Sequence, residues 1–311
     1  MAFTAKDVMK LREMTGAGMM NCKKALTETD GDMDKAAEYL REMGVTIAAK
    51  KASRIASEGV VAAYTSADGK IGALVEVNCE SDFVGKGDVF HGLCDDLAKQ
   101  VALNNPASSD ELLAQNSLTY AGTVTDQINS VTTATGEKVA FRRFIRSEVE
   151  GKVETYIHMG GKIGVMLTVK TGKNLNDNEE FNTACHDIAM HIAAFGPKYT
   201  YNSEVPADEV AKEREILNAQ IKNDPKRANK PAQIIEKMID GGIAKMYKEV
   251  CLIDQDFVKD NTVTIAGVIA RLAKANDTEI SIVKFDRFVM GEGLEKKTED
   301  FAEEIAKLSN M

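Results

Sequence analysis

The sequence predicts an α+β protein whose core contains two copies of one strand–helix unit. The chain has 311 residues, of which 44% are hydrophobic and 28% are charged, so it is long enough for more than one globular domain. One copy of the unit spans 69–106 and the other spans 161–197. Both begin with Gly-Lys-Ile-Gly and continue through an apolar run into a helical pattern, at an offset of 91 to 92 residues. A repeat on this scale indicates a duplicated supersecondary unit.

The two copies differ between the strand and the helix. The first carries Glu-Ser-Asp-Phe-Val-Gly at 80–85, whereas the second carries the polar sequence Lys-Asn-Leu-Asn-Asp-Asn at 173–178. A phenylalanine next to an aspartate, in one copy of a shared scaffold, indicates a functional loop. The candidate site residues in that loop are Ser81, Asp82, Phe83 and Val84.

A structural interpretation of this loop is also open. Ser81 or Asp82 could cap the following helix while Phe83 packs onto the core. Gly85 and Gly87 favour a projecting loop instead, because each glycine in a first helical turn costs roughly 1 kcal/mol relative to alanine. An exposed aromatic ring on a rigid turn is typical of a residue that anchors a protein partner.

The first 56 residues predict a small helical bundle. The pattern over 4–43 indicates three short helices, the first beginning at a capping box on Thr4. The Gly-Ala-Gly at 16–18 and the Asp-Gly-Asp at 30–32 separate the helices. Residues 45–56 predict a helical connector.

From Gly59 onward the hydrophobic period changes to two, which predicts strands. The expected strands are Val60–Tyr64, Ile71–Val77, Val139–Val149, Val153–His158 and Ile163–Val169. A helix with Phe90, Leu97 and Val101 on its apolar face follows the second of these strands. Two strand-rich halves, each backed by a helix, account for the α+β prediction.

The last third of the chain is predicted to be mostly helical. Residues 208–249 form two amphipathic helices around a proline-containing turn, which predicts an antiparallel helical hairpin. A helix at 262–275, a strand at Ile280–Met290 and a last helix at Thr298–Leu308 follow. The resulting division into domains is 1–54, 55–151, 152–206 together with 250–293, 207–249 inserted as the hairpin, and 294–311 as a C-terminal module.

Composition and motifs argue against several functions. A net charge of −9 argues against direct nucleic-acid binding, and no apolar run is long enough to predict a membrane span. Five scattered cysteines and an N-terminus without a targeting pattern predict a cytoplasmic protein with reduced thiols. None of the Gly-Lys pairs is followed by Ser or Thr as a phosphate-binding loop requires. No cofactor is therefore expected.

Two chemical alternatives have weaker support. Cys94 and Cys185, each near a histidine, resemble metal ligands at helical spacing, but both fall on apolar helix faces where small buried residues belong. Cys79 near Asp82 could serve a thiol enzyme. Because Cys79 continues the inward phase of Val75 and Val77, a place in the core is favoured.

Four segments of the chain resemble the bacterial translation elongation factor Ts family. They are Leu11–Leu26, Val75–Val84, Ile188–Ala194 and Arg287–Lys296. The resemblance runs essentially from end to end. It implies an N-terminal domain like the ubiquitin-associated (UBA) domain, two α+β subdomains, a protruding coiled coil and a small helical module.

The resemblance also implies a function. Members of this family are guanine-nucleotide exchange factors of elongation factor Tu, which they bind in its GDP-bound and nucleotide-free forms, without covalent chemistry, cofactor, nucleic acid or membrane. A homodimer is left open. The family's contact positions fall on Arg12, Met19, Met20, Asp82, Phe83, His158, His186 and Val258.

The chain departs from the family pattern at four positions. Ser81 stands where threonine is usual, Gly85 replaces another small residue, Asp256 replaces a proline, and Cys185 occupies a position that is often basic. The hypothesis for the mechanism is that Phe83 wedges into the partner and disturbs its magnesium and phosphate site. The main alternative is a scaffold that binds a translation protein without opening its nucleotide site. A cysteine hydrolase is a much weaker alternative.

Overall fold

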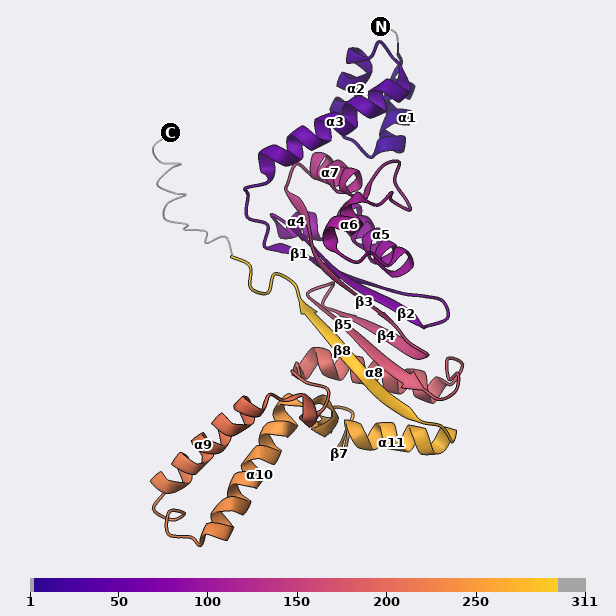
Figure 1. The fold of residues 1–311 in the computed structure, drawn as a ribbon. Helices are drawn as coiled ribbons and strands as arrows, with labels where there is room; N and C mark the ends of the chain where they lie inside the picture. Colours follow the sequence, from indigo (N-terminus) through magenta and orange to yellow (C-terminus); the bar gives the residue numbers. More distant parts are fainter. Residues whose placement is uncertain (1–2, 296–311) are drawn as a thin grey trace, which may run out of the picture.

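The computed structural model describes residues 3–295 and contains two antiparallel sheets packed face to face, with helices on both outer sides (Figure 1). The first sheet has the order β1 (Glu58–Thr65), β2 (Ile71–Cys79), β3 (Val139–Glu148). The second has the order β4 (Gly151–His158), β5 (Ile163–Thr171), β8 (Ile280–Val289). This mixture of helices and antiparallel sheets confirms the α+β prediction.

Three helices form the N-terminal bundle, namely α1 (Ala5–Thr15), α2 (Met19–Glu28) and α3 (Met33–Lys51). The Thr4–Asp7 capping box begins α1, and Gly16 ends it with φ +67°. The expected division between a third helix and a connector is wrong, because α3 continues to Lys51. Gly44 in its middle lies against a core helix, where an added Cβ would make an ordinary contact with Asn129 at 3.6 Å.

Helices on the outer side of the first sheet are α4 (Asp82–Gly85), α5 (Asp88–Asn104), α6 (Ser109–Ala114) and α7 (Val124–Thr135). The sequence prediction missed α6 and α7. Both are rich in Ser, Thr and Asp, so their helical pattern is weak, but each begins at a side-chain cap, from Ser108 and Thr123. The buried face of α7 carries Val124, Ile128 and Val131.

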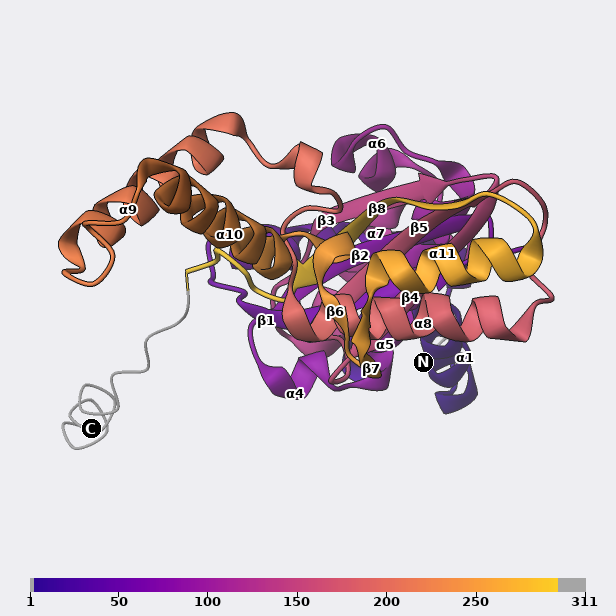
Figure 2. The ribbon, with the colours of Figure 1, turned by 90° about the horizontal axis from the view of Figure 1, so that it is seen from below.

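The second half continues with α8 (Glu179–Phe195), η1 (Asn202–Glu204), α9 (Ala207–Asn223), α10 (Ala232–Val250), η2 (Leu252–Asp254), β6 (Asp256–Phe257), β7 (Asp260–Thr264) and α11 (Ile265–Asn276). The helix expected from residue 262 begins later, because 260–264 pair with β6 as a strand. The helices α9 and α10 project from the body as an antiparallel pair (Figures 1 and 2). The last helix expected, at 298–308, lies outside the described residues.

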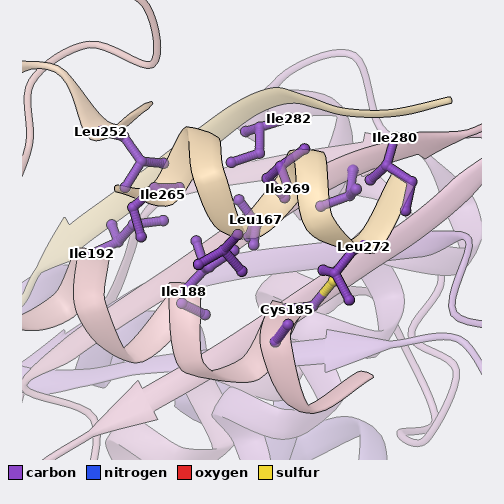
Figure 3. Close-up of a cluster of buried hydrophobic side chains, with 14 of the residues drawn as sticks. Leu167, Cys185, Ile188, Ile192, Leu252, Ile265, Ile269, Leu272, Ile280 and Ile282 are labelled. Carbon is purple, nitrogen blue, oxygen red and sulfur yellow. The ribbon is translucent and has the colours of Figure 1, made fainter. Parts of the chain in front are cut away.

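Each half has its own apolar core between its sheet and its helices. In the second half, side chains of α8 and α11 meet over β5 and β8 (Figure 3). The repeat is visible in these cores: Phe90 and Phe181 are each 0% exposed, as are Leu97 and Ile188. Burying a phenylalanine ring stabilises the fold by about 2 to 3 kcal/mol.

The two sheets contact each other through equivalent residues of the repeat. The Val61 amide donates to the Gly161 carbonyl at 2.8 Å, and 92 residues later the Val153 amide donates to the Gly69 carbonyl at 2.7 Å. Glycines allow this approach, since a Cβ on Gly72 would lie 2.4 Å from Val153 Cγ1. The two halves are therefore related by approximate two-fold symmetry.

We expect Gly72→Ala to lower the free energy of unfolding by about 1 to 3 kcal/mol, because the added methyl group overfills the contact between the sheets. The control is Gly92→Ala, at a helical position where a Cβ meets nothing within 4 Å. That variant should be stabilised by up to about 1 kcal/mol. Urea denaturation measures both, and equal effects of the two substitutions would contradict the packing argument.

A buried ionic cluster joins the first sheet to the end of β8. The side chain of Glu76 is 0% exposed and lies 2.7 Å from both Arg142 and Arg143, and it accepts the Gly291 amide at 2.8 Å. Burial opposes the charged form, but these hydrogen bonds together hold the pKa of Glu76 below its ordinary value of 4.5. The carboxylate therefore stays ionised and ties β2 and β3 to the chain that leaves β8.

We expect Glu76→Gln to cost about 3 kcal/mol at pH 7, because it leaves the two guanidinium groups without their shared carboxylate. A lowered pKa makes this contribution present above the ordinary carboxyl pKa and lost as the pH falls through the folded-state value. The difference in unfolding free energy between wild type and variant should therefore shrink below about pH 4. A difference that is constant from pH 7 to pH 3 would contradict the assignment.

Candidate functional site

Phe83 projects from the short helix α4 and is 84% exposed. The segment predicted as a loop is in fact one helical turn, because the Ser81 hydroxyl accepts the Val84 amide at 3.4 Å and caps it. The capping part of the structural interpretation is confirmed, whereas its packing of Phe83 onto the core is wrong. The same turn is thus both capped and projecting.

Two glutamates hold the start of α4 in place. The Ser81 hydroxyl donates to Glu137 at 2.6 Å, and the Ser81 amide donates to the same carboxylate at 2.9 Å. Glu80 accepts the Lys138 amide at 2.6 Å and pairs with Arg54 at 3.2 Å. These contacts connect α4 to the turn between α7 and β3 and to the end of α3, so the ring of Phe83 stands on a fixed support.

The carboxylate of Asp82 points along α4 to Lys86, at 2.6 Å. The hydrogen bond and the charge of Lys86 lower the pKa of Asp82. Asp82 is therefore ionised at neutral pH, and its position next to Phe83 is set by an interaction within the same turn.

Cys79 is part of the core and not a nucleophile. Its side chain is 0% exposed, and its thiol donates to the Ser81 carbonyl at 3.1 Å. Burial, with the nearby charges of Glu137 and Glu58, raises the pKa of Cys79 to about 12. The thiolate that a cysteine hydrolase needs is absent at neutral pH.

Within residues 3–295, no group of three His, Cys, Asp or Glu side chains is placed to hold a metal ion.

All five cysteines are buried, so we expect the native protein to react slowly with a thiol reagent at pH 8. Unfolding in guanidinium chloride should release five reactive thiols per chain. Absorbance after addition of a disulfide reagent measures both states. One fast-reacting thiol in the native protein would contradict the buried position of every cysteine.

A second group of predicted contact residues gathers on β4 and α8. Tyr156 hydrogen-bonds His158 through its hydroxyl at 2.9 Å, and its ring meets that of His186 edge-on at 5.5 Å. His186 also contacts the carboxylate of Glu154 at 3.0 Å. The structure therefore brings His158 and His186, 28 residues apart in the chain, to one aromatic surface.

Val258 lies in the turn between β6 and β7 and is 47% exposed. The next residue, Lys259, pairs with Asp187 of α8 at 2.9 Å. Val258 therefore lies beside α8, the helix that also carries His186. Asp256, which replaces the family's usual proline, forms part of β6 and pairs with Lys248 at 3.3 Å.

The third group lies on the bundle. Met20 is 73% exposed and Met19 47% exposed, at the start of α2. Both line a hollow of about 400 Å³ together with Phe3, Val8 and Met9. Arg12 is exposed on α1 but does not line this hollow.

The three groups lie on separate elements of the molecule. The helices α1 and α4 and the β6–β7 turn all project at the lower edge of Figure 2.

Sequence reasoning missed the support of α4 by Glu137, which lies 56 residues from Ser81 and carries no local signal. It also missed the pairing of Asp82 with Lys86, although their spacing of four residues is that of a helical ion pair.

An exposed aromatic side chain on a firmly held turn is typical of a protein that acts by contact with another protein. The family model described as Elongation factor TS matches residues 80–292. Proteins named Elongation factor Ts from Clostridium acetobutylicum and Clostridium perfringens are 45% and 46% identical, over 98% of this chain and 97% and 98% of theirs. The protein of that name from Trichlorobacter lovleyi is 43% identical over the full length of both chains.

The chain therefore belongs to the elongation factor Ts family and is a translation elongation factor. Membership implies nucleotide exchange on elongation factor Tu as its role in protein biosynthesis. Among residues 3–295, none of the helices has the length and apolar character needed to cross a bilayer.

Proposed function

We propose that the protein binds elongation factor Tu in its GDP-bound and nucleotide-free forms and opens its nucleotide site through the turn that carries Asp82 and Phe83. Family membership supports the partner. The observation that carries the mechanism is the exposure of Phe83, 84% on a turn held by Glu137 and Glu80. A large apolar side chain that its own fold leaves in water is suited to enter a pocket of another protein.

The proposed step is a displacement within the partner. Phe83 enters between elements of the GTP-binding domain and moves groups that support the magnesium ion and the phosphates. Without the ion, the phosphate charge that it neutralised is exposed, and GDP binds more weakly. Because linkage is reciprocal, nucleotide weakens binding of the factor by the same free energy. Incoming GTP therefore releases the factor, which makes it a catalyst of exchange without covalent chemistry.

The other two surfaces supply binding energy for this distortion. Arg12, Met19 and Met20 on the bundle, and His158, His186 and Val258 on the second half, are the proposed contact residues. Their exposed apolar atoms and ring edges can be buried against the partner, while the turn of α4 acts at the nucleotide site. Three separated contacts hold the partner in a defined orientation.

The division of labour follows the domains that the sequence predicts. The bundle with its connector at 1–54, taken as UBA-like, and the second half at 152–206 and 250–293 bind, while the first half at 55–151 opens the site. The hairpin at 207–249, taken as a coiled coil, stands away from the α4 turn. Its apolar seam includes Ile221, Ile239 and Ile243.

We expect Phe83→Ala to slow factor-stimulated GDP release by roughly thirtyfold, equivalent to about 2 kcal/mol of lost displacement energy. Stopped-flow fluorescence with labelled GDP on elongation factor Tu measures the rate. Because Phe83 makes little contact with its own fold, the Tm of the variant should match that of the wild type. Leu103→Ala is the control, since Leu103 is 48% exposed at the far end of α5.

Equal release rates for Phe83→Ala and the wild type would refute the assigned mechanism. A wild-type chain that binds elongation factor Tu but leaves the rate of GDP release unchanged would instead establish the scaffold alternative.

A further inference from the structure

The turn between β4 and β5 holds a methionine in a conformation that disfavours it. Among the described residues, four residues other than glycine have a positive φ, and three of them are aspartate or asparagine. The fourth is Met159, with φ +50°. Aspartate and asparagine tolerate this region through local hydrogen bonds, whereas methionine has no such compensation.

The side chain of Met159 gains little from its own fold, since it is 72% exposed. Gly160 and Gly161 follow it with φ +61° and +91°. The other two residues of this turn with a positive φ are therefore glycines, as the backbone conformation favours. The equivalent turn of the first half, at 66–69, is Ser-Ala-Asp-Gly and carries no large apolar side chain. An exposed apolar residue in an unfavourable backbone conformation indicates a contact outside the molecule.

The backbone around Met159 is firmly held. The Gly161 carbonyl accepts the Val61 amide at 2.8 Å, and Lys162 is bonded through its amide to the His158 carbonyl at 3.1 Å. The side chain of Lys162 pairs with Glu58 at 2.9 Å. Met159 is thus presented from a support as fixed as that of Phe83.

The turn faces α4 across a hollow of about 230 Å³. One side is formed by Asp82, Gly85 and Lys86, and the other by Met159, Gly160 and Lys162. Phe83 is adjacent to Asp82 in the chain. The exposed methionine of the second half therefore lines the same hollow as Asp82 and Lys86 of the turn that carries Phe83, while Phe83 itself lies outside the hollow.

We propose that Met159 is a second apolar contact residue for the GTP-binding domain that Phe83 enters. This inference rests on the proposed function and deepens it. A surface ridge of the partner that fills the hollow contacts the methionine and lies next to the turn that carries Phe83. The flexible thioether adapts to such a ridge and adds affinity, while the rigid ring of Phe83 performs the displacement.

The decisive variant is Met159→Gly, because it removes the side chain and the backbone strain together. Its Tm should equal or exceed that of the wild type. Its Kd for nucleotide-free elongation factor Tu, measured by titration calorimetry, should be about fivefold to tenfold weaker. The rate of GDP release at saturating factor should stay within about twofold, since the displacing ring is intact.

Two further variants complete the experiment. Met159→Leu keeps an apolar side chain of similar volume and should bind within about twofold of the wild type. Leu103→Ala removes an exposed apolar side chain elsewhere and should bind unchanged.

Unchanged affinity of Met159→Gly would overturn the inference, and so would a fall in its Tm together with its affinity, which would indicate a structural part for the methionine. These results leave the exchange mechanism untouched as long as the wild type accelerates GDP release and Phe83→Ala does not. Failure of the wild type to accelerate release refutes the proposed function, while the affinity of Met159→Gly still decides the contact.

Discussion

The close packing of the two sheets places every candidate group on the second half relative to α4. It depends on two equivalent backbone hydrogen bonds, from Val61 to Gly161 and from Val153 to Gly69. Glycines make both approaches possible, because a Cβ on Gly161 would lie 2.5 Å from Val60 Cγ1 and a Cβ on Gly72 would lie 2.4 Å from Val153 Cγ1. The bond to Gly161 fixes the β4–β5 turn against β1. The neighbour of β1 in the sheet is β2, and α4 begins three residues after the end of β2.

Duplication supplied a symmetric frame, and the two halves then diverged where function or cohesion required it. Glu76 and Thr168 are equivalent positions, and both sheets change register directly after them. Thr168 meets Ser147 through a hydroxyl pair at 2.8 Å, whereas Glu76 gathers two arginines and the amide of Gly291. The ionic cluster around Glu76 holds the chain after β8 against the first sheet, so it stabilises the association of the two halves.

The α4 turn shows how a fold can hold an apolar ring in water. The ring of Phe83 gains no burial energy, so its position depends on polar contacts of its neighbours with Glu137, Lys138 and Arg54. These contacts are bonds to charged groups, which are stronger than neutral ones. The ring is therefore already oriented in the free factor, so less conformational entropy is lost when the partner binds.

The sequence by itself determined the strands of the two main sheets, the bundle, the hairpin and the difference between the two copies, since these follow from local periodicity and caps. It also identified Phe83 as the residue of interest. Only the tertiary structure decided that Phe83 is exposed while Ser81 caps the turn, because Glu137 and Ser81 are far apart in the chain. The same holds for Met159, whose meaning depends on a backbone angle and on a neighbouring half. Contacts between distant segments leave no periodic signal in the chain that makes them.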